Sequence, residues 1–158
     1  KNFHLFVEGT QAKNVVQSMQ LASYFSGKAI NIATTTAPHA WSYYLSSHLG
    51  ISHGTAVWYT LPKVFDIHMN SINLREGVTP SIHKDNMKRL SKLIGINESK
   101  PSNFFYKYLS HLGLNLDISN FRMENRLSML QSANLDRMSN NPIVFNDSEQ
   151  EYIFDLSN

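Results

Sequence analysis

Histidines 39 and 53 are the residues of this chain whose type and spacing best suit metal chemistry. They lie fourteen positions apart, each near the start of a predicted helix. Neutral imidazole is a common nitrogen ligand for iron, zinc and nickel. Seven histidines in 158 residues produce pairs at almost any spacing, so the spacing alone does not identify a metal centre.

Local helix signals place the two imidazoles. A helix is predicted over 40–48. Thr36 is its candidate cap, Pro38 suits its first turn, and Gly50 is its candidate C-terminal stop. Ser52 is the candidate cap of a second helix, which begins at His53 and which Pro62 ends or kinks. A tight loop between the helices would then bring the two rings towards one another.

The residues around both histidines carry a recognisable pattern. The matching positions are Ala37-Pro38-His39-Ala40, Ser42-Tyr43, Gly50-Ile51, His53-Gly54, Ala56-Val57 and Leu61-Pro62. Together they resemble the iron-containing (group III) alcohol dehydrogenases, in which two metal-binding histidines flank such a segment at this separation. A weaker likeness is Arg137 followed by Asn140-Asn141-Pro142, which is similar to a C-terminal element of that family. The resemblance implies that His39 and His53 are metal ligands.

The resemblance also implies a domain organisation. Residues 1–158 would form the C-terminal helical, metal-site domain, as a fragment without the N-terminal α/β domain that binds NAD(P) in this family. The family takes two further ligands, an Asp and a His, from an upstream helix that has no match here. Fe²⁺ is the metal implied first, with Zn²⁺ or Ni²⁺ as alternatives, and NAD(P) would bind mainly through the missing domain.

Two ligands limit what the chain can do alone. A catalytic divalent ion needs at least three protein ligands and an open position for substrate. The chain by itself is therefore expected to bind metal weakly and to be inactive. In the intact protein, the resemblance implies interconversion of an alcohol and an aldehyde by metal-assisted hydride transfer. Relatives with Ser-Tyr after the first histidine reduce small aldehydes, including phosphonate-bearing ones.

Tyr43 and Ser42 are the candidate substrate contacts. Tyr43 follows His39 by one helical turn and shares its face. Better-known relatives have a histidine there, near the nicotinamide, so this departure puts a histidine-based proton relay in doubt. Tyr43 could donate a hydrogen bond to substrate or simply fill the pocket. We assign no catalytic residue from the sequence.

The rest of the chain predicts an all-α, multi-helix bundle. The resemblance implies that this bundle is of the dehydroquinate synthase-like type, as in the C-terminal helical domain of iron alcohol dehydrogenases. From Thr10 to residue 33 the pattern is apolar over so wide an arc that it predicts a buried central helix, with Gly27 allowing close packing. Further helices are predicted over 63–72, 82–94, 102–112, 121–137 and 149–156, the last capped by Asp147 or Ser148. No sustained period-2 alternation predicts a strand.

Side-chain patterns predict which face of two of these helices is buried. In the helix predicted over 82–94, the apolar residues should face inward: Ile82, Met87, Leu90, Leu93 and Ile94. The basic residues should face outward: Lys84, Lys88, Arg89 and Lys92. In 102–112 four aromatic side chains should belong to the core: Phe104, Phe105, Tyr106 and Tyr108.

Composition excludes several classes of partner. A net charge of +2 gives no reason to expect nucleic acid or an anionic membrane. No apolar run approaches the roughly 18 residues of a membrane span and no signal peptide is visible, so a cytoplasmic location is expected. Charged residues make up only 16%, which suggests a surface covered by another domain, and a homodimer stays open.

Two other functions stay open at this point. The first is a lyase of the dehydroquinate synthase type, which has basic residues around its histidines for a phosphate-bearing substrate. The segment 38–61 contains no Lys or Arg, which argues against it. The second is a non-enzymatic helical module that packs on a partner. The apolar, uncapped start at 1–8 fits that module and equally fits a truncated end.

Overall fold

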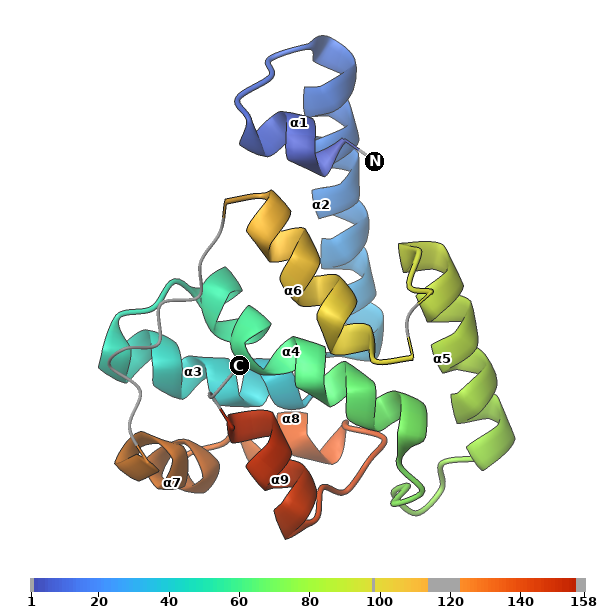
Figure 1. Cartoon of the computed structure of the whole chain (residues 1–158), viewed down its shortest axis with the longest axis vertical. Helices are drawn as coiled ribbons and strands as arrows, with labels where there is room; N and C mark the ends of the chain where they lie inside the picture. The colour runs from blue at the N-terminus through green and yellow to red at the C-terminus, as the bar shows by residue number, and fades with distance from the viewer. Residues whose placement is uncertain (1, 98, 114–122, 156–158) are drawn as a thin grey trace.

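A computed structural model of the chain describes residues 2–97, 99–113 and 123–155. Over these residues the elements are helices without strands, which confirms the predicted all-α fold (Figure 1). The described helices are α1 (Phe3–Val7), α2 (Lys13–Ala33), α3 (Ala37–Leu49), α4 (His53–Asn70), α5 (Pro80–Ile94), α6 (Pro101–His111), α7 (Met123–Gln131), α8 (Leu135–Ser139) and α9 (Asp147–Phe154).

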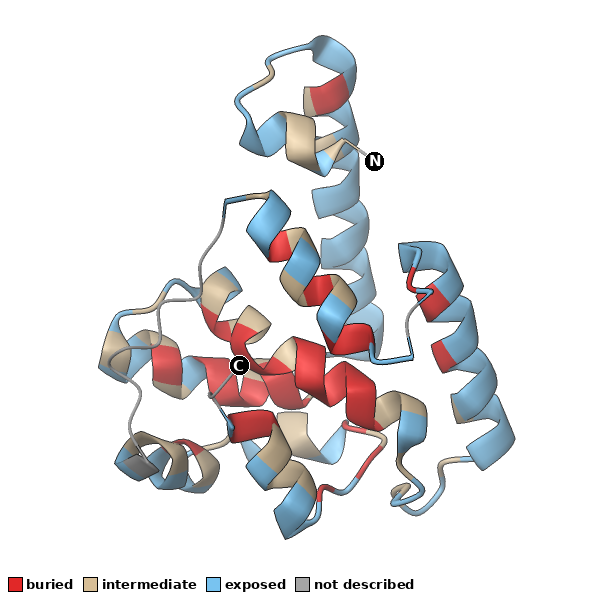
Figure 2. Ribbon diagram, in the orientation of Figure 1, coloured by how far each residue is buried: buried red, intermediate tan, exposed pale blue. Residues whose placement is uncertain are grey.

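Helices α3 and α4 form the centre of the domain. They pack side by side, with α6 against one side of α4 and α8 and α9 beneath the pair (Figure 1). Buried residues concentrate on these two helices (Figure 2). The main core joins Trp41 and Leu45 of α3 to Ala56 of α4 and to Ile143 and Ile153 near the C-terminus. The helices that carry the two candidate ligands are thus the best anchored in the domain.

The predicted stop at Gly50 and the predicted start at His53 are confirmed, whereas α3 begins three residues before the predicted position 40 and the predicted capping contacts are absent. Helix α3 ends before Gly50, whose φ of 67° is the left-handed conformation that suits glycine, and α4 begins at His53. The side chain of Thr36 makes no capping hydrogen bond. Ser52 Oγ instead lies 2.7 Å from Thr55 Oγ1.

Pro62 lies inside α4 and does not end it. The helix continues to Asn70, two residues short of the predicted end at position 72. A proline at this position removes the N–H that would bond to the carbonyl of Trp58. Pro62 is buried, as are most residues that follow it in α4, and α4 contacts α3, α6 and α9 around this point. Packing on several sides therefore outweighs the lost hydrogen bond.

The prediction that α2 is the buried centre of the bundle is wrong in this structure. Val15 is the one buried residue of this helix, which projects from the domain with α1 beside it (Figures 1 and 2). Tyr24 and Phe25 are 59% and 57% exposed. A Cβ at Gly27 would meet nothing within 4 Å, so close packing does not explain this glycine. An apolar arc shows that a helix needs covering, but not which segment covers it.

The predicted faces of α5 and α6 are correct in part. The basic residues of α5 are exposed as predicted, but of its five predicted inward residues only Met87 is buried, and Ile82 and Leu93 are exposed. In α6, Phe105 is buried in a cluster with Phe65 and Met87, while the other three aromatic side chains are half-buried.

The C-terminal third departs from the predicted helices. The helix predicted over 121–137 is divided at 132–134, and its first two residues lie outside the described part of the chain. Asn134 begins α8 by accepting a hydrogen bond from the backbone N–H of Arg137 at 2.9 Å. Asn146, rather than Asp147 or Ser148, caps α9, in a reciprocal capping box with Glu149. Position 156, the predicted end of this helix, also lies outside the described residues.

His68 connects the end of α4 to the segment after α8. Its Nε2 lies 3.2 Å from Asn141 Oδ1, and the Nε2 of His83 donates to the His68 carbonyl at 3.0 Å. Burial, and next the nearby His83, lower the pKa of His68 to about 4, against a small opposing effect of the Asn141 hydrogen bond. The native fold therefore holds His68 as a neutral imidazole.

This burial predicts a pH-dependent stability. Above about pH 6.5 His68 is neutral in both states and contributes no pH dependence. As the pH falls from 6.5 towards 4, His68 becomes protonated in the unfolded chain but stays neutral in the folded chain. The free energy of unfolding should therefore drop by about 3 kcal/mol. Urea unfolding at stepped pH should show this drop. His68→Gln should remove most of it and the exposed-site control His48→Gln should not; an unchanged drop in His68→Gln would refute the assignment.

Candidate metal centre

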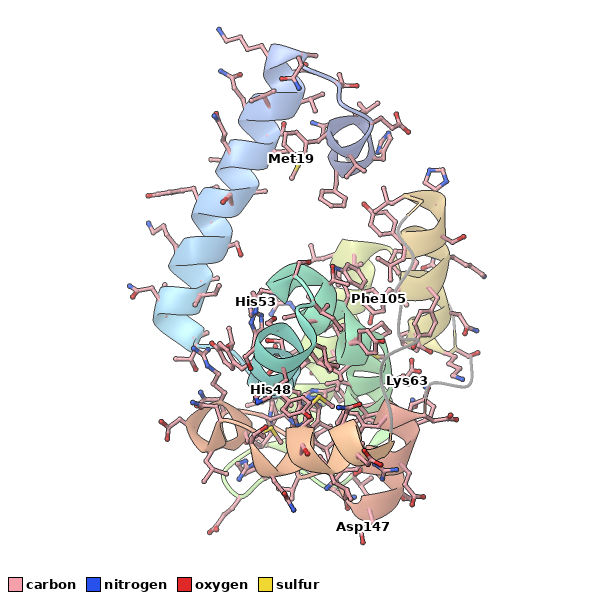
Figure 3. All side chains as sticks on the ribbon, turned by 90° about the vertical axis from the view of Figure 1, so that its left-hand side faces the viewer. Met19, His48, His53, Lys63, Phe105 and Asp147 are labelled. Atoms are coloured by element: carbon pink, nitrogen blue, oxygen red, sulfur yellow. The ribbon has the colours of Figure 1, made fainter. Side chains whose placement is uncertain are left out.

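His39 and His53 face each other across the α3–α4 hairpin. His39 lies in the first turn of α3, and His53 is the first residue of α4. Their ring centroids are 5.1 Å apart, with the ring planes tilted by 49°. In Figure 3, His53 lies on the side of the α3–α4 pair that faces α2. The turn that begins at Gly50 reverses the chain and thereby brings together two residues fourteen positions apart.

Both predicted substrate contacts lie beside this pair, in different environments. Ser42 is fully buried, and its Oγ lies 2.8 Å from the His39 carbonyl oxygen and 3.3 Å from Nδ1 of His53. The Tyr43 ring centroid is 6.0 Å from that of His53, and the residue is 43% exposed. A molecule from solution can therefore reach Tyr43 but not the Ser42 hydroxyl.

Arg137 is a third neighbour, which the sequence prediction left without a role. Its Cζ lies 5.2 Å from the centre of the Tyr43 ring, and its Nη1 donates a hydrogen bond to Thr35 Oγ1. Arg137 belongs to the weaker sequence likeness that includes Asn140-Asn141-Pro142, but no local signal in the sequence places it beside α3. A guanidinium over the ring of Tyr43 holds that ring in place and adds positive charge next to His39.

The electrostatic surroundings keep His39 neutral. Its pKa is lowered by burial first, then by the positive forms of His53 and Arg137. A neutral imidazole retains the lone pair that a metal ion needs. His39 therefore has the protonation state of a metal ligand at neutral pH.

Three of the four ring nitrogens of this pair are available to a metal, because only Nδ1 of His53 has a protein partner among the described residues, Ser42 Oγ. In the described part of the chain, neither ring nitrogen of His39 makes a hydrogen bond, and Nε2 of His53 makes none either. His68 and His83 form a second pair at a similar separation, with ring centroids 5.4 Å apart. Both of their Nε2 atoms make hydrogen bonds to protein groups. The first pair thus fits two metal ligands and the second pair fits a structural role.

The described residues do not complete a metal site. Among residues 2–97, 99–113 and 123–155, no group of three or more His, Cys, Asp or Glu side chains is placed to hold an ion. His48, on the same helix as His39, packs against Tyr44 with ring centroids 4.4 Å apart and takes no part in the pair. Within this described set, His39 and His53 therefore have no third side chain of these types placed beside them.

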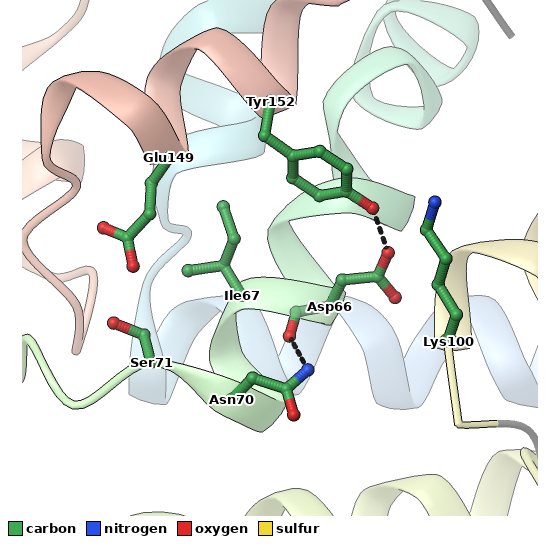
Figure 4. Close-up of a pocket in the computed structure, with 7 residues that line it drawn as sticks. All are labelled: Asp66, Ile67, Asn70, Ser71, Lys100, Glu149 and Tyr152. Atoms are coloured by element: carbon green, nitrogen blue, oxygen red, sulfur yellow. Dashed lines mark hydrogen bonds between the residues drawn. The ribbon is translucent and has the colours of Figure 1, made fainter.

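A separate polar cluster lines a cavity of about 400 Å³ between α4 and α9 (Figure 4). Asp66 accepts hydrogen bonds from the Ser102 N–H at 2.7 Å and from the Tyr152 hydroxyl at 2.5 Å. Burial, and then Asp66, raise the pKa of Tyr152, and the same causes raise the pKa of Tyr106 to about 12. These phenols stay protonated at neutral pH, and the Tyr152 hydroxyl proton is held by Asp66.

Comparison with known proteins identifies the family. Residues 1–135 match the family described as "Fe-containing alcohol dehydrogenase family, C-terminal", a range that includes both histidines, Ser42 and Tyr43 but not Arg137. Neither the curated proteins nor the solved structures yield a match. In the described part of the chain, no helix is both long and apolar enough to cross a bilayer. Because the match covers well over half of its residues, this chain belongs to the Fe-containing alcohol dehydrogenase family and corresponds to its C-terminal domain.

Proposed function

We propose that this chain is the metal-binding helical domain of an NAD(P)-dependent oxidoreductase that interconverts an alcohol and an aldehyde. The observation that carries the proposal is the His39–His53 pair. Its ring centroids are 5.1 Å apart, and neither His39 nitrogen nor Nε2 of His53 makes a hydrogen bond in the described region. This pair occurs in a chain whose family is named for its iron. A lyase of the dehydroquinate synthase type is disfavoured, because the segment 38–61 lacks the basic residues expected for its substrate.

His39 and His53 would hold a divalent ion, Fe²⁺ first and Zn²⁺ or Ni²⁺ as alternatives. When bound, such an ion polarises the oxygen of an aldehyde or alkoxide. Tyr43, half-exposed beside the pair, would donate its hydroxyl proton in a hydrogen bond to the substrate oxygen. Arg137 would keep the Tyr43 ring in position through its contact with the ring face, itself held by Thr35.

The exposed side of α2 supports the proposal that other parts of the enzyme complete the site. This helix carries large apolar side chains on its surface: Leu21, Tyr24, Phe25, Ile30 and Ile32. Such residues are costly to leave in water, and His53 lies on the side of the hairpin that faces α2. We propose that residues 1–158 act as one C-terminal domain, with an N-terminal α/β domain supplying NAD(P) binding and further ligands.

Metal binding tests this proposal directly. Calorimetric titration of the metal-free chain with Zn²⁺ should show weak binding, because two ligands do not complete a site. His39→Ala and His53→Ala should each weaken that binding by at least about tenfold, since each removes half of the ligands. His48→Ala is the matched control, because this exposed histidine of α3 lies outside the pair and should leave binding unchanged.

Activity provides the second readout. In the protein joined to its nucleotide-binding domain, either histidine variant should abolish aldehyde-dependent oxidation of NADH or NADPH. Wild-type Zn²⁺ affinity and full activity in both variants would refute the proposed function.

A further inference from the structure

We propose that Ser42 sets the tautomer of His53, with the proton on Nδ1 and the lone pair on Nε2. Ser42 is then a positioning residue for a ligand rather than a substrate contact. The use of the Nε2 lone pair by a metal rests on the proposed function; the tautomer itself does not.

The hydrogen-bonding capacity of a serine decides the direction of its bonds. The Ser42 hydroxyl has one proton to donate and two lone pairs that accept. Its oxygen lies 2.8 Å from the His39 carbonyl oxygen, which can only accept, so the hydroxyl proton belongs to that bond. Towards Nδ1 of His53, at 3.3 Å, the same oxygen can then only accept. Nδ1 must therefore carry the N–H.

A neutral imidazole has one N–H, so the Nε2 of His53 is left with its lone pair exposed for coordination. Metal-binding histidines commonly donate their other ring N–H to a protein acceptor, which fixes both the tautomer and the ring orientation. Ser42 is fully buried, so water does not compete for its hydroxyl. The same side chain contacts the backbone of His39 and the ring of His53, and so links the two candidate ligands.

Ser42 and Tyr43 thus divide two roles between neighbouring positions. The hydroxyl of Ser42 is used inside the protein, whereas Tyr43 remains reachable from solution. The substrate contact predicted for Ser42 is replaced here by a contact with a ligand side chain.

Nitrogen NMR of the metal-free protein tests the tautomer without any variant. Long-range ¹H–¹⁵N correlation spectra of the ¹⁵N-labelled 158-residue chain, recorded at pH 8 with chelator, distinguish a protonated from an unprotonated ring nitrogen. We expect His53 to show a protonated Nδ1 and an unprotonated Nε2. A dominant Nε2–H form of His53 would overturn the proposal, whether or not the protein binds metal.

Two variants test the cause. Ser42→Ala should shift His53 towards the Nε2–H form and weaken Zn²⁺ binding by about 10- to 100-fold. Ser46→Ala is the matched control: it removes a buried hydroxyl from the same helix that has no partner in the described structure. It should change neither readout. An unchanged His53 tautomer in a folded Ser42→Ala chain would overturn the proposal.

The outcomes separate this inference from the proposed function. A protonated Nδ1 that is lost in Ser42→Ala, with no Zn²⁺ bound by the wild-type chain, supports the role of Ser42 and counts against the metal-binding function. If Ser42→Ala does not fold, the wild-type spectrum decides.

Discussion

Trp41→Ala is expected to lower the free energy of unfolding by about 3–5 kcal/mol. Trp41 is 1% exposed, and its ring centroid lies 5.6 Å from that of Phe145 and 5.1 Å from that of Phe154. Its removal would open a cavity between α3 and the C-terminal segment, where the surrounding helices cannot collapse without moving. Urea unfolding should report the loss as a lower midpoint at an unchanged slope.

Trp41→Phe is the matched control for this prediction. The indole Nε1 is buried without a hydrogen-bond partner in the described structure. Phenylalanine keeps much of the ring, and no hydrogen bond is lost. The cost should therefore be well below that of alanine. Equal losses in the two variants would show that Nε1 has a partner, or that the ring does not pack as described.

Asp66→Leu should destabilise the fold by a similar amount, about 3–5 kcal/mol. Asp66 is buried, with its two oxygens bonded to the Ser102 N–H and the Tyr152 hydroxyl. The buried Lys63 lies in the same cluster: burial lowers its pKa most, while the negative charges of Asp155 and Asp66 raise it. Loss of this carboxylate leaves a buried cation less compensated and a buried N–H without its acceptor.

A double-mutant cycle with Lys63→Met separates these contributions. Because Met removes the buried cation, the double variant should cost less than the sum of the two single variants. Asp66→Asn keeps an oxygen that can accept from Ser102, so it should be less damaging than Asp66→Leu. Strictly additive losses in thermal or urea unfolding would show that the two charges do not interact.

The positions of the candidate ligands could be predicted because local signals place them. Pro38 and Gly50 act within one turn of the backbone, and α3 has its proline in the first turn and its glycine just past the last turn, as predicted. These signals predict His39 in the first turn of one helix, and the short connection after Gly50 predicts His53 near the start of the next. The hydrogen bonds of the Thr36 and Ser52 hydroxyls could not be predicted in the same way, because a hydroxyl can bond to any of several nearby partners.

Predictions of burial succeeded less well, and α2 shows why. Its wide apolar arc is real, yet Tyr24 and Phe25 are exposed in this chain. Periodicity reports which side of a helix avoids water, but the covering surface is a separate, long-range choice. The sequence did not predict the break before α8 or the cap at Asn146, for a related reason. Several Asn, Asp and Ser residues in this region are equivalent candidates for ending or starting a helix.

The sequence by itself determined the helical class of this chain through its apolar periodicity, and its family through the residues around His39 and His53. It also placed these two histidines at adjacent helix starts, because prolines and glycines act over a few residues. Tertiary structure alone decided that the rings face one another, that Ser42 bonds to His53 and that Arg137 lies against Tyr43. These contacts depend on how α3 packs against α4 and α8, and such packing is set by the fit of many side chains that are distant in sequence.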